Sequence, residues 1–90
     1  MNRTFSLVIE RKNELLPRVG FSRSTLQSKI HDGLWPPAIS LGGDRAVGFL
    51  KHETDEMVIA YISGHSKEEI RELVVKLIEE RKTLMGANYG

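Results

Sequence analysis

The arrangement of the whole chain follows from one segment, LLPRVGFSRSTL at residues 15–26. Just before it, Asn13 is a suitable N-cap and predicts a short helix. We expect this helix to end at Gly20, because glycine tolerates the positive φ of a tight turn. Ser22 is a strong N-cap for a second helix, predicted over about residues 23–32. Two short helices joined by a glycine turn are typical of a helix-turn-helix.

The second predicted helix has two faces of different character. At 100° per residue, Leu26 and Ile30 fall on one side, which we expect to pack on the first helix. The opposite side is a polar stripe made of Ser24, Gln27, Ser28 and His31. The stripe has no acid to repel phosphate, so it is suited to face DNA, although an ordinary solvated surface is the alternative.

A small β-hairpin is predicted after the second helix. The prolines in Trp35-Pro36-Pro37 exclude a helix and force an extended turn, and Trp35 itself is expected in the core. Apolar and polar residues alternate over 39–41 and 46–49, and Gly42-Gly43-Asp44-Arg45 between them is typical of a turn. At the start of the chain, residues 5–9 are β-prone and predict a short arm.

Two further helices are expected. The first spans residues 51–62, and its early acids are interpreted as solvated helix-start charges. Its apolar stripe is predicted to be Met57, Val58, Tyr61 and Ile62. The second opens with a capping box at Ser66-Lys67-Glu68-Glu69 and continues to about Leu84.

The last helix has an apolar side that needs a partner. This side is made of Ile70, Leu73, Val74, Leu77 and Ile78. We favour packing onto the same domain over a helix–helix dimer, because a small domain gains from covering its thin core and the apolar register ends at Arg81. Residues 1–64 are expected to form a winged helix-turn-helix DNA-binding domain with its N-terminal arm. Residues 65–90 are expected to form a C-terminal helix, either in the same folding unit or as a dimerisation element.

Together these elements predict a mainly α fold with a small β-hairpin wing, that is, a winged helix-turn-helix plus a C-terminal amphipathic helix. Such a fold binds double-stranded DNA with its second helix in the major groove. Lys12 flanks the expected surface, and Arg45 lies at the tip of the predicted wing. The candidate DNA-binding residues are Arg18, Ser22, Arg23, Ser24, Thr25, Gln27, Ser28, Lys29, His31, Gly43 and Arg45.

Charge and composition exclude several other classes of function. Residues 1–51 carry eight Lys or Arg against four acids, whereas residues 52–90 carry five against eight, so only the first part is suited to a polyanion. The chain has no cysteine, no catalytic motif and no clustered histidines, so we expect no enzyme activity, no metal and no cofactor. Without a long apolar run or a signal peptide, the chain is expected to be cytoplasmic and independent of membranes.

Three segments in order, 15–26, 33–39 and 41–50, resemble the AlpA family of small phage and prophage regulators. The resemblance covers about residues 12–62. It implies a winged helix-turn-helix related to MerR-type DNA-binding domains and phage excisionases. The implied function is sequence-specific DNA binding, either as a transcriptional regulator of a prophage integrase gene or as a factor that directs excisive recombination.

The resemblance also implies partners and shows departures. An integrase is a candidate partner, and the apolar side of the last helix adds further copies of the chain, as a homodimer or a cooperative assembly on DNA. Gln27 stands where the family usually has Tyr, so a base preference cannot be carried over. Phe49 and Met57 replace the usual Trp, and Thr54 an aliphatic residue, at positions expected in the core. The competing hypothesis is a protein-interaction adapter that binds through its C-terminal helix.

Overall fold

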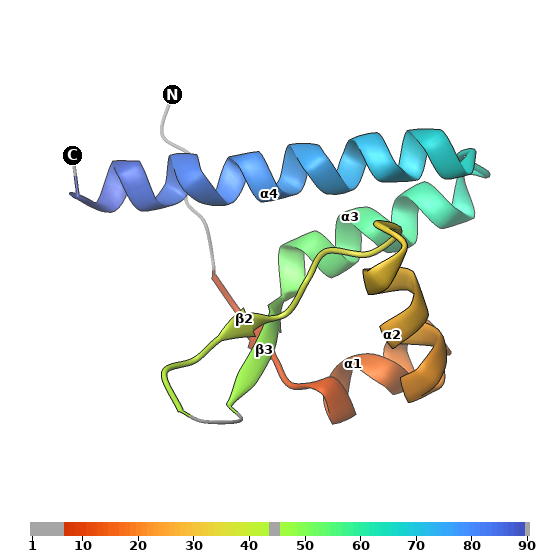
Figure 1. Cartoon of the computed structure of the whole chain (residues 1–90), viewed down its shortest axis with the longest axis horizontal. Coiled ribbons are helices and arrows are strands. Elements are labelled where there is room, and N and C mark those ends of the chain that lie inside the picture. Colours follow the sequence, from red (N-terminus) through yellow and green to blue (C-terminus); the bar gives the residue numbers. More distant parts are fainter. Residues whose placement is uncertain (1–6, 44–45, 90) are drawn as a thin grey trace.

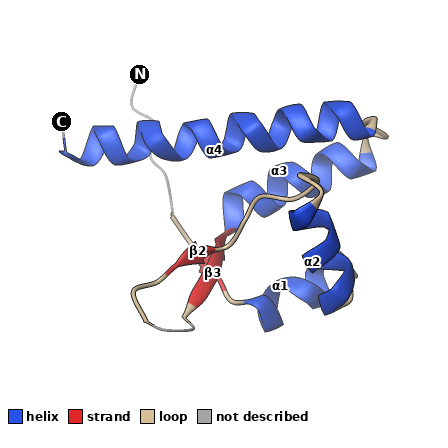
Figure 2. Cartoon of the chain, in the orientation of Figure 1, coloured by secondary structure: helices blue, strands red, loops and turns tan. Residues whose placement is uncertain are grey.

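The computed structural model describes residues 7–43 and 46–89, with the backbone alone for 84–89. It is mainly helical and has one small antiparallel sheet, as predicted, and is consistent with a winged helix-turn-helix (Figures 1 and 2). The elements in chain order are β1 (Ile9–Glu10), α1 (Lys12–Val19), α2 (Arg23–His31), β2 (Ile39–Ser40), β3 (Val47–Leu50), α3 (Lys51–Ile62) and α4 (Lys67–Tyr89).

The helix-turn-helix is formed by α1 and α2. Gly20 adopts φ 76°, and its N–H donates to the Leu16 carbonyl, which ends α1 as expected. The predicted N-cap of α1 is wrong: the cap is Arg11, and the helix begins at Lys12. The reason is the Glu14 carboxylate, which accepts a hydrogen bond of 2.8 Å from the Arg11 backbone N–H and so extends the helix start.

The sheet contains the predicted hairpin and one additional strand. β3 lies in the centre, with β1 and β2 antiparallel on its two sides. Only an arm was expected from residues 5–9, but Ile9 pairs with Leu50 and completes the sheet. Gly48 makes this close approach possible, because a Cβ there would lie 2.5 Å from Ile9 Cγ2 and 3.3 Å from the Glu10 carbonyl oxygen.

The hydrophobic core lies between the helix-turn-helix, α3 and α4. Trp35 is buried, as predicted, and its ring is stacked on Tyr61 and meets Phe21 edge-on. Three of the positions that depart from the AlpA pattern are core positions, as expected, since Phe49, Met57 and Thr54 are at most 2% exposed. The buried cluster comprises Leu15, Leu26, Leu34, Trp35, Phe49, Met57, Ala60, Ile70, Val74 and Leu77.

The predicted apolar stripe of α3 requires a correction. Met57 is buried, but Ile62 is 80% exposed and Ala60 takes an inner position instead. The helical period explains this, because Glu53, Met57 and Ala60 share one side, whereas Ile62 lies five positions after Met57 and points away. The interpretation of Glu53 as a solvated charge is also wrong, since it is only 2% exposed.

The long helix α4 runs beside α3 (Figure 1). The predicted capping box is present: the Ser66 N–H donates to Glu69 Oε1 at 2.8 Å, and the Glu69 N–H donates to Ser66 Oγ at 3.2 Å. These bonds lower the pKa of Glu69. The helix continues to Tyr89, beyond the expected Leu84. In this single chain its inner side chains belong to the same buried cluster as Trp35.

Two positions of α4 that are two residues apart test whether the helix is part of the core in solution. Leu77 is 1% exposed and Val75 is 60% exposed. We expect Leu77→Ala to lower the free energy of unfolding by about 2–5 kcal/mol, because it leaves a cavity. Val75→Ala should change it by less than about 0.5 kcal/mol. Urea unfolding of both variants measures the difference, and equal losses would show that α4 does not pack in this way.

Candidate nucleic-acid interface

The polar stripe of α2 lies on the surface, opposite the buried Leu26. All four of its side chains are exposed: Ser24, Gln27, Ser28 and His31. The helix contains no acid between Arg23 and His31, and the neighbouring Asp32 lies 3.3 Å from His31 Nδ1. The stripe therefore presents hydroxyl, amide and imidazole groups, which can hydrogen-bond to base edges without repelling phosphate.

Two of the predicted contact residues mainly shape the start of α2. Ser22 Oγ accepts a hydrogen bond from the Thr25 N–H at 3.1 Å and donates one to Thr25 Oγ1 at 2.9 Å. Ser24 Oγ lies 3.2 Å from Ser22 Oγ. The Ser22 hydroxyl therefore caps the N-terminus of α2, and the hydroxyls of Ser24 and Thr25 lie beside it.

Lys29 is less available than the sequence predicted. Its Nζ lies 5.1 Å from the centre of the Phe21 ring and 4.8 Å from that of Tyr61. Such positions are stabilised by cation–π attraction. The Tyr61 hydroxyl donates to the Leu34 carbonyl at 2.9 Å, and burial raises the pKa of Tyr61. Lys29 therefore packs against aromatic rings on the side of α2 that faces α3, next to the polar stripe.

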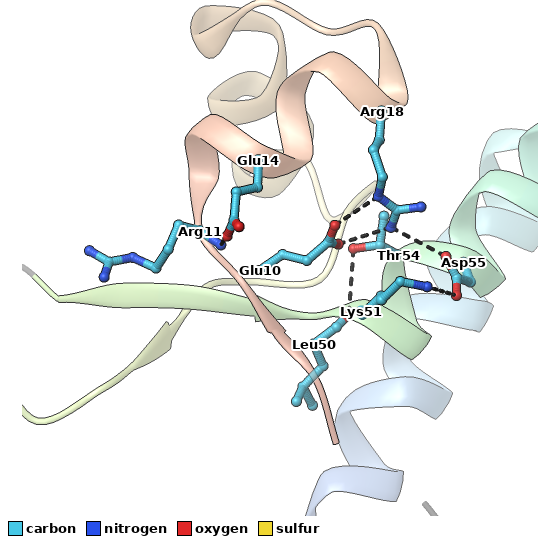
Figure 3. A network of polar contacts seen from close by, with 8 residues as sticks. All are labelled: Glu10, Arg11, Glu14, Arg18, Leu50, Lys51, Thr54 and Asp55. Atoms are coloured by element: carbon cyan, nitrogen blue, oxygen red, sulfur yellow. Dashed lines mark hydrogen bonds and ion pairs between the residues drawn. The ribbon is translucent and has the colours of Figure 1, made fainter. Parts of the chain in front are cut away.

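Arg18 forms an ion-pair network, shown in Figure 3. Its Nε and Nη2 donate to the two carboxylate oxygens of Glu10 at 2.7 and 2.9 Å, and Nη2 also donates to Asp55 at 3.2 Å. Lys51 reaches the other oxygen of Asp55 at 3.2 Å. The network joins β1, α1 and α3, so the first role of Arg18 is to hold these elements together.

The ionisation of this network follows from its contacts. The hydrogen bond to Glu10 is the largest influence on Arg18 and raises its pKa, in spite of partial burial. Burial is the largest single influence on Asp55 and raises its pKa, but hydrogen bonds and charge from Lys51 and Arg18 together outweigh it. The pKa of Asp55 is therefore lowered, and the carboxylate stays charged.

A basic groove of about 500 Å³ lies between the helix-turn-helix and the sheet. Its lining residues are Arg11, Lys12, Asn13, Arg23 and Val47. They come from the starts of α1, α2 and β3. In Figure 3 the Arg11 side chain points away from the Arg18 network. Cations beside two helix N-termini make the groove attractive to an anion such as phosphate.

Part of this groove was missed by the sequence analysis. Arg23 was a predicted contact and Lys12 a predicted flanking residue, but Arg11 and Asn13 were not chosen. The pair of cations Arg11-Lys12 directly before a helix was the available signal. On the wing, Gly43 is exposed, whereas Arg45 and Asp44 lie outside the described residues.

Among residues 7–43 and 46–89, no three His, Cys, Asp or Glu side chains are grouped in a way that could hold a metal ion. None of the helices described combines the length and the apolar character needed to cross a membrane.

The family comparison agrees with this geometry. The family model described as prophage CP4-57 regulatory protein (AlpA) matches residues 9–59. The chain belongs to the AlpA family. The match includes β1, α1, α2, the hairpin and most of α3, so the AlpA region contains the stripe and the whole basic groove. It ends before α4. No curated protein and no solved structure matches the chain significantly.

The structural role of Arg18 can be separated from a surface role. Glu10 is buried at 7% exposure, so Arg18→Met leaves its carboxylate without its main partner. We expect a loss of about 1–3 kcal/mol in the free energy of unfolding, reduced from the value for a fully buried pair because Arg18 is partly solvated.

The matched control is Arg23→Met, at an exposed position that lines the groove. It should leave the free energy of unfolding within about 0.5 kcal/mol of the wild type. Urea unfolding at neutral pH measures both variants. An equal, small effect for the two would contradict the structural assignment of Arg18.

Proposed function

We propose that this AlpA-family protein is a sequence-specific, double-stranded DNA-binding regulator of a phage or integrative element. The observation that carries the proposal is the exposed, acid-free stripe of α2 beside a groove lined by three cations. A regulator acting on DNA needs one surface that distinguishes bases and another that holds the backbone. The stripe and the groove supply these two surfaces within one small domain.

In this proposal α2 enters the major groove. Gln27 is in the middle of the stripe, and its carboxamide can both donate and accept, which suits the N6 and N7 atoms of adenine. Ser24, Ser28 and His31 would contact neighbouring base edges or bridging waters. Arg23 lies at the first position of α2, where it can reach a phosphate or a guanine.

The basic groove would hold the DNA backbone between the helix-turn-helix and the wing. Arg11, Lys12 and Arg23 supply positive charge, and the N-termini of α1 and α2 add partial positive charge. Gly43 and Arg45 on the wing extend this backbone contact in the proposal. Phosphate contacts of this kind set position and affinity, while the stripe sets the sequence preference.

The family membership supports a regulatory role, and we propose transcriptional control, excisive recombination or both, acting in the cytoplasm with an integrase as a candidate partner. A homodimer or cooperative assembly on DNA remains part of this proposal. The competing adapter hypothesis relied on the apolar side of α4. Because Ile70, Val74 and Leu77 are buried in the single chain, an adapter would have to use another surface.

Selection of bound sequences from random duplexes tests the proposal. We expect an enriched motif for the wild type and a different preferred base for Gln27→Ala, with a loss of about 1–3 kcal/mol on the original motif. Thr83→Ala, which changes an exposed polar residue on α4, is the control and should keep the motif. Enrichment of no motif by the wild type would reject the proposal and favour an adapter.

The groove is tested by the salt dependence of binding. Arg11→Ala and Lys12→Ala should each weaken binding to all duplexes alike and reduce the salt slope by about one unit. Lys76→Ala removes an exposed cation from α4 and should change neither quantity. Titrations at several salt concentrations measure the slopes. If both groove variants matched Lys76→Ala, the groove would not be the backbone site.

A further inference from the structure

The segment that joins α2 to the wing is held by side chains from outside the helix-turn-helix. Arg71 Nε donates to the Asp32 carbonyl at 3.1 Å, and the Tyr61 hydroxyl donates to the Leu34 carbonyl at 2.9 Å. Arg81 Nη2 donates to the Pro37 carbonyl at 2.9 Å. The two arginines belong to α4, so this helix contacts the segment at both of its ends.

Arg81 is itself fixed in place. Its Nε and Nη2 reach the two oxygens of Glu53 at 2.7 and 2.6 Å, and the two side chains are only 18% and 3% exposed. A guanidinium bound through two nitrogens to one carboxylate has a set orientation. One side chain of α4 therefore joins α3 to Pro37, two residues before the start of the wing strand β2.

The joining segment has little freedom between these contacts. Trp35 and Pro36 are almost completely buried, and two consecutive prolines have fixed φ angles. Figure 1 shows the segment running close below α4 before it descends to β2. The distance from α2 to the wing is thus set by a stiff segment whose carbonyls are held by α3 and α4.

We propose that Arg71 and Arg81 are positioning residues that hold the wing in register with α2. This inference rests on the proposed function, in which both elements contact one duplex. The helix α4 lies beyond the family match at residues 9–59. In this inference it contributes to DNA binding by positioning the wing. The two arginines touch no DNA in this scheme and act through the Asp32 and Pro37 carbonyls.

The geometry can be measured directly, because the chain contains no cysteine. Spin labels at Ser28→Cys on α2 and Ser40→Cys on β2, both exposed positions, report the distance between the recognition helix and the wing. We expect a narrow distance distribution in the wild-type background and a broader one with Arg81→Met or Arg71→Met. Lys82→Met is the matched control, since Lys82 is exposed on α4 and pairs only with Glu79 among described residues.

The second readout is binding to the selected duplex by chains without labels, at a temperature where circular dichroism shows each variant folded. Apparent affinity falls in proportion to the fraction of molecules in the competent arrangement. If the wing of Arg81→Met is in register with α2 about a tenth of the time, this variant binds the duplex about tenfold more weakly than the wild type. Lys82→Met is expected to bind like the wild type. If Arg81→Met does not fold, binding is measured with Arg71→Met instead, because this change removes one hydrogen bond at an exposed residue.

The outcomes separate this inference from the proposed function. Broader distributions and weaker binding for the arginine variants support the positioning role. Unchanged distributions, with binding within about twofold of the wild type, overturn it, because the carbonyl contacts would then not set the register. A wild type that binds no duplex rejects the proposed function instead. In that case the label distances still decide whether α4 holds the wing.

Discussion

Burial of the Trp35 ring holds the helix-turn-helix against α3, and the other elements are arranged around this contact. Its ring meets Phe21 edge-on at 5.4 Å and stacks on Tyr61 at 6.2 Å, so one side chain joins the turn of the helix-turn-helix to α3. Aromatic pairs of this kind add about 0.5–1.5 kcal/mol each to the effect of burial. Because Trp35 stands between α2 and the wing, its position also determines where the chain leaves the core to form the hairpin.

Around this aromatic centre, two buried carboxylates set the relative placement of the other elements. Glu10 binds Arg18 and joins the sheet to α1, while Glu53 binds Arg81 and joins α3 to α4. Replacing such pairs with apolar residues often costs little stability, so their effect lies more in which arrangement is allowed. A buried acid without a guanidinium beside it is costly, so each pair disfavours packings that separate its two side chains.

These internal ion pairs also determine which cations are left for a ligand. Arg18 and Arg81 are bound to acids, and Lys29 lies over two aromatic rings. Arg11, Lys12 and Arg23 instead line an open groove at the helix starts. The positive charge of the chain is thereby divided into a structural set and a set that faces the proposed DNA backbone. This division explains how a chain of net charge +1 can present a locally basic surface.

Elements whose signals are local can be predicted from the amino-acid sequence. Gly20, the Ser22 cap, the two prolines after Trp35 and the Ser66–Glu69 box each act over a few residues, so the helix-turn-helix, the hairpin, α3 and the start of α4 could all be predicted. The stripe of α2 could be predicted too, because the helical period alone places it on the outside. The pairing of β1 with β3, the burial of Glu53 and the different surroundings of Arg18 and Arg11 become visible only in the folded chain. These features depend on partners far away in the chain. The sequence does not show whether a charged side chain pairs with an opposite charge on another element or is solvated by water.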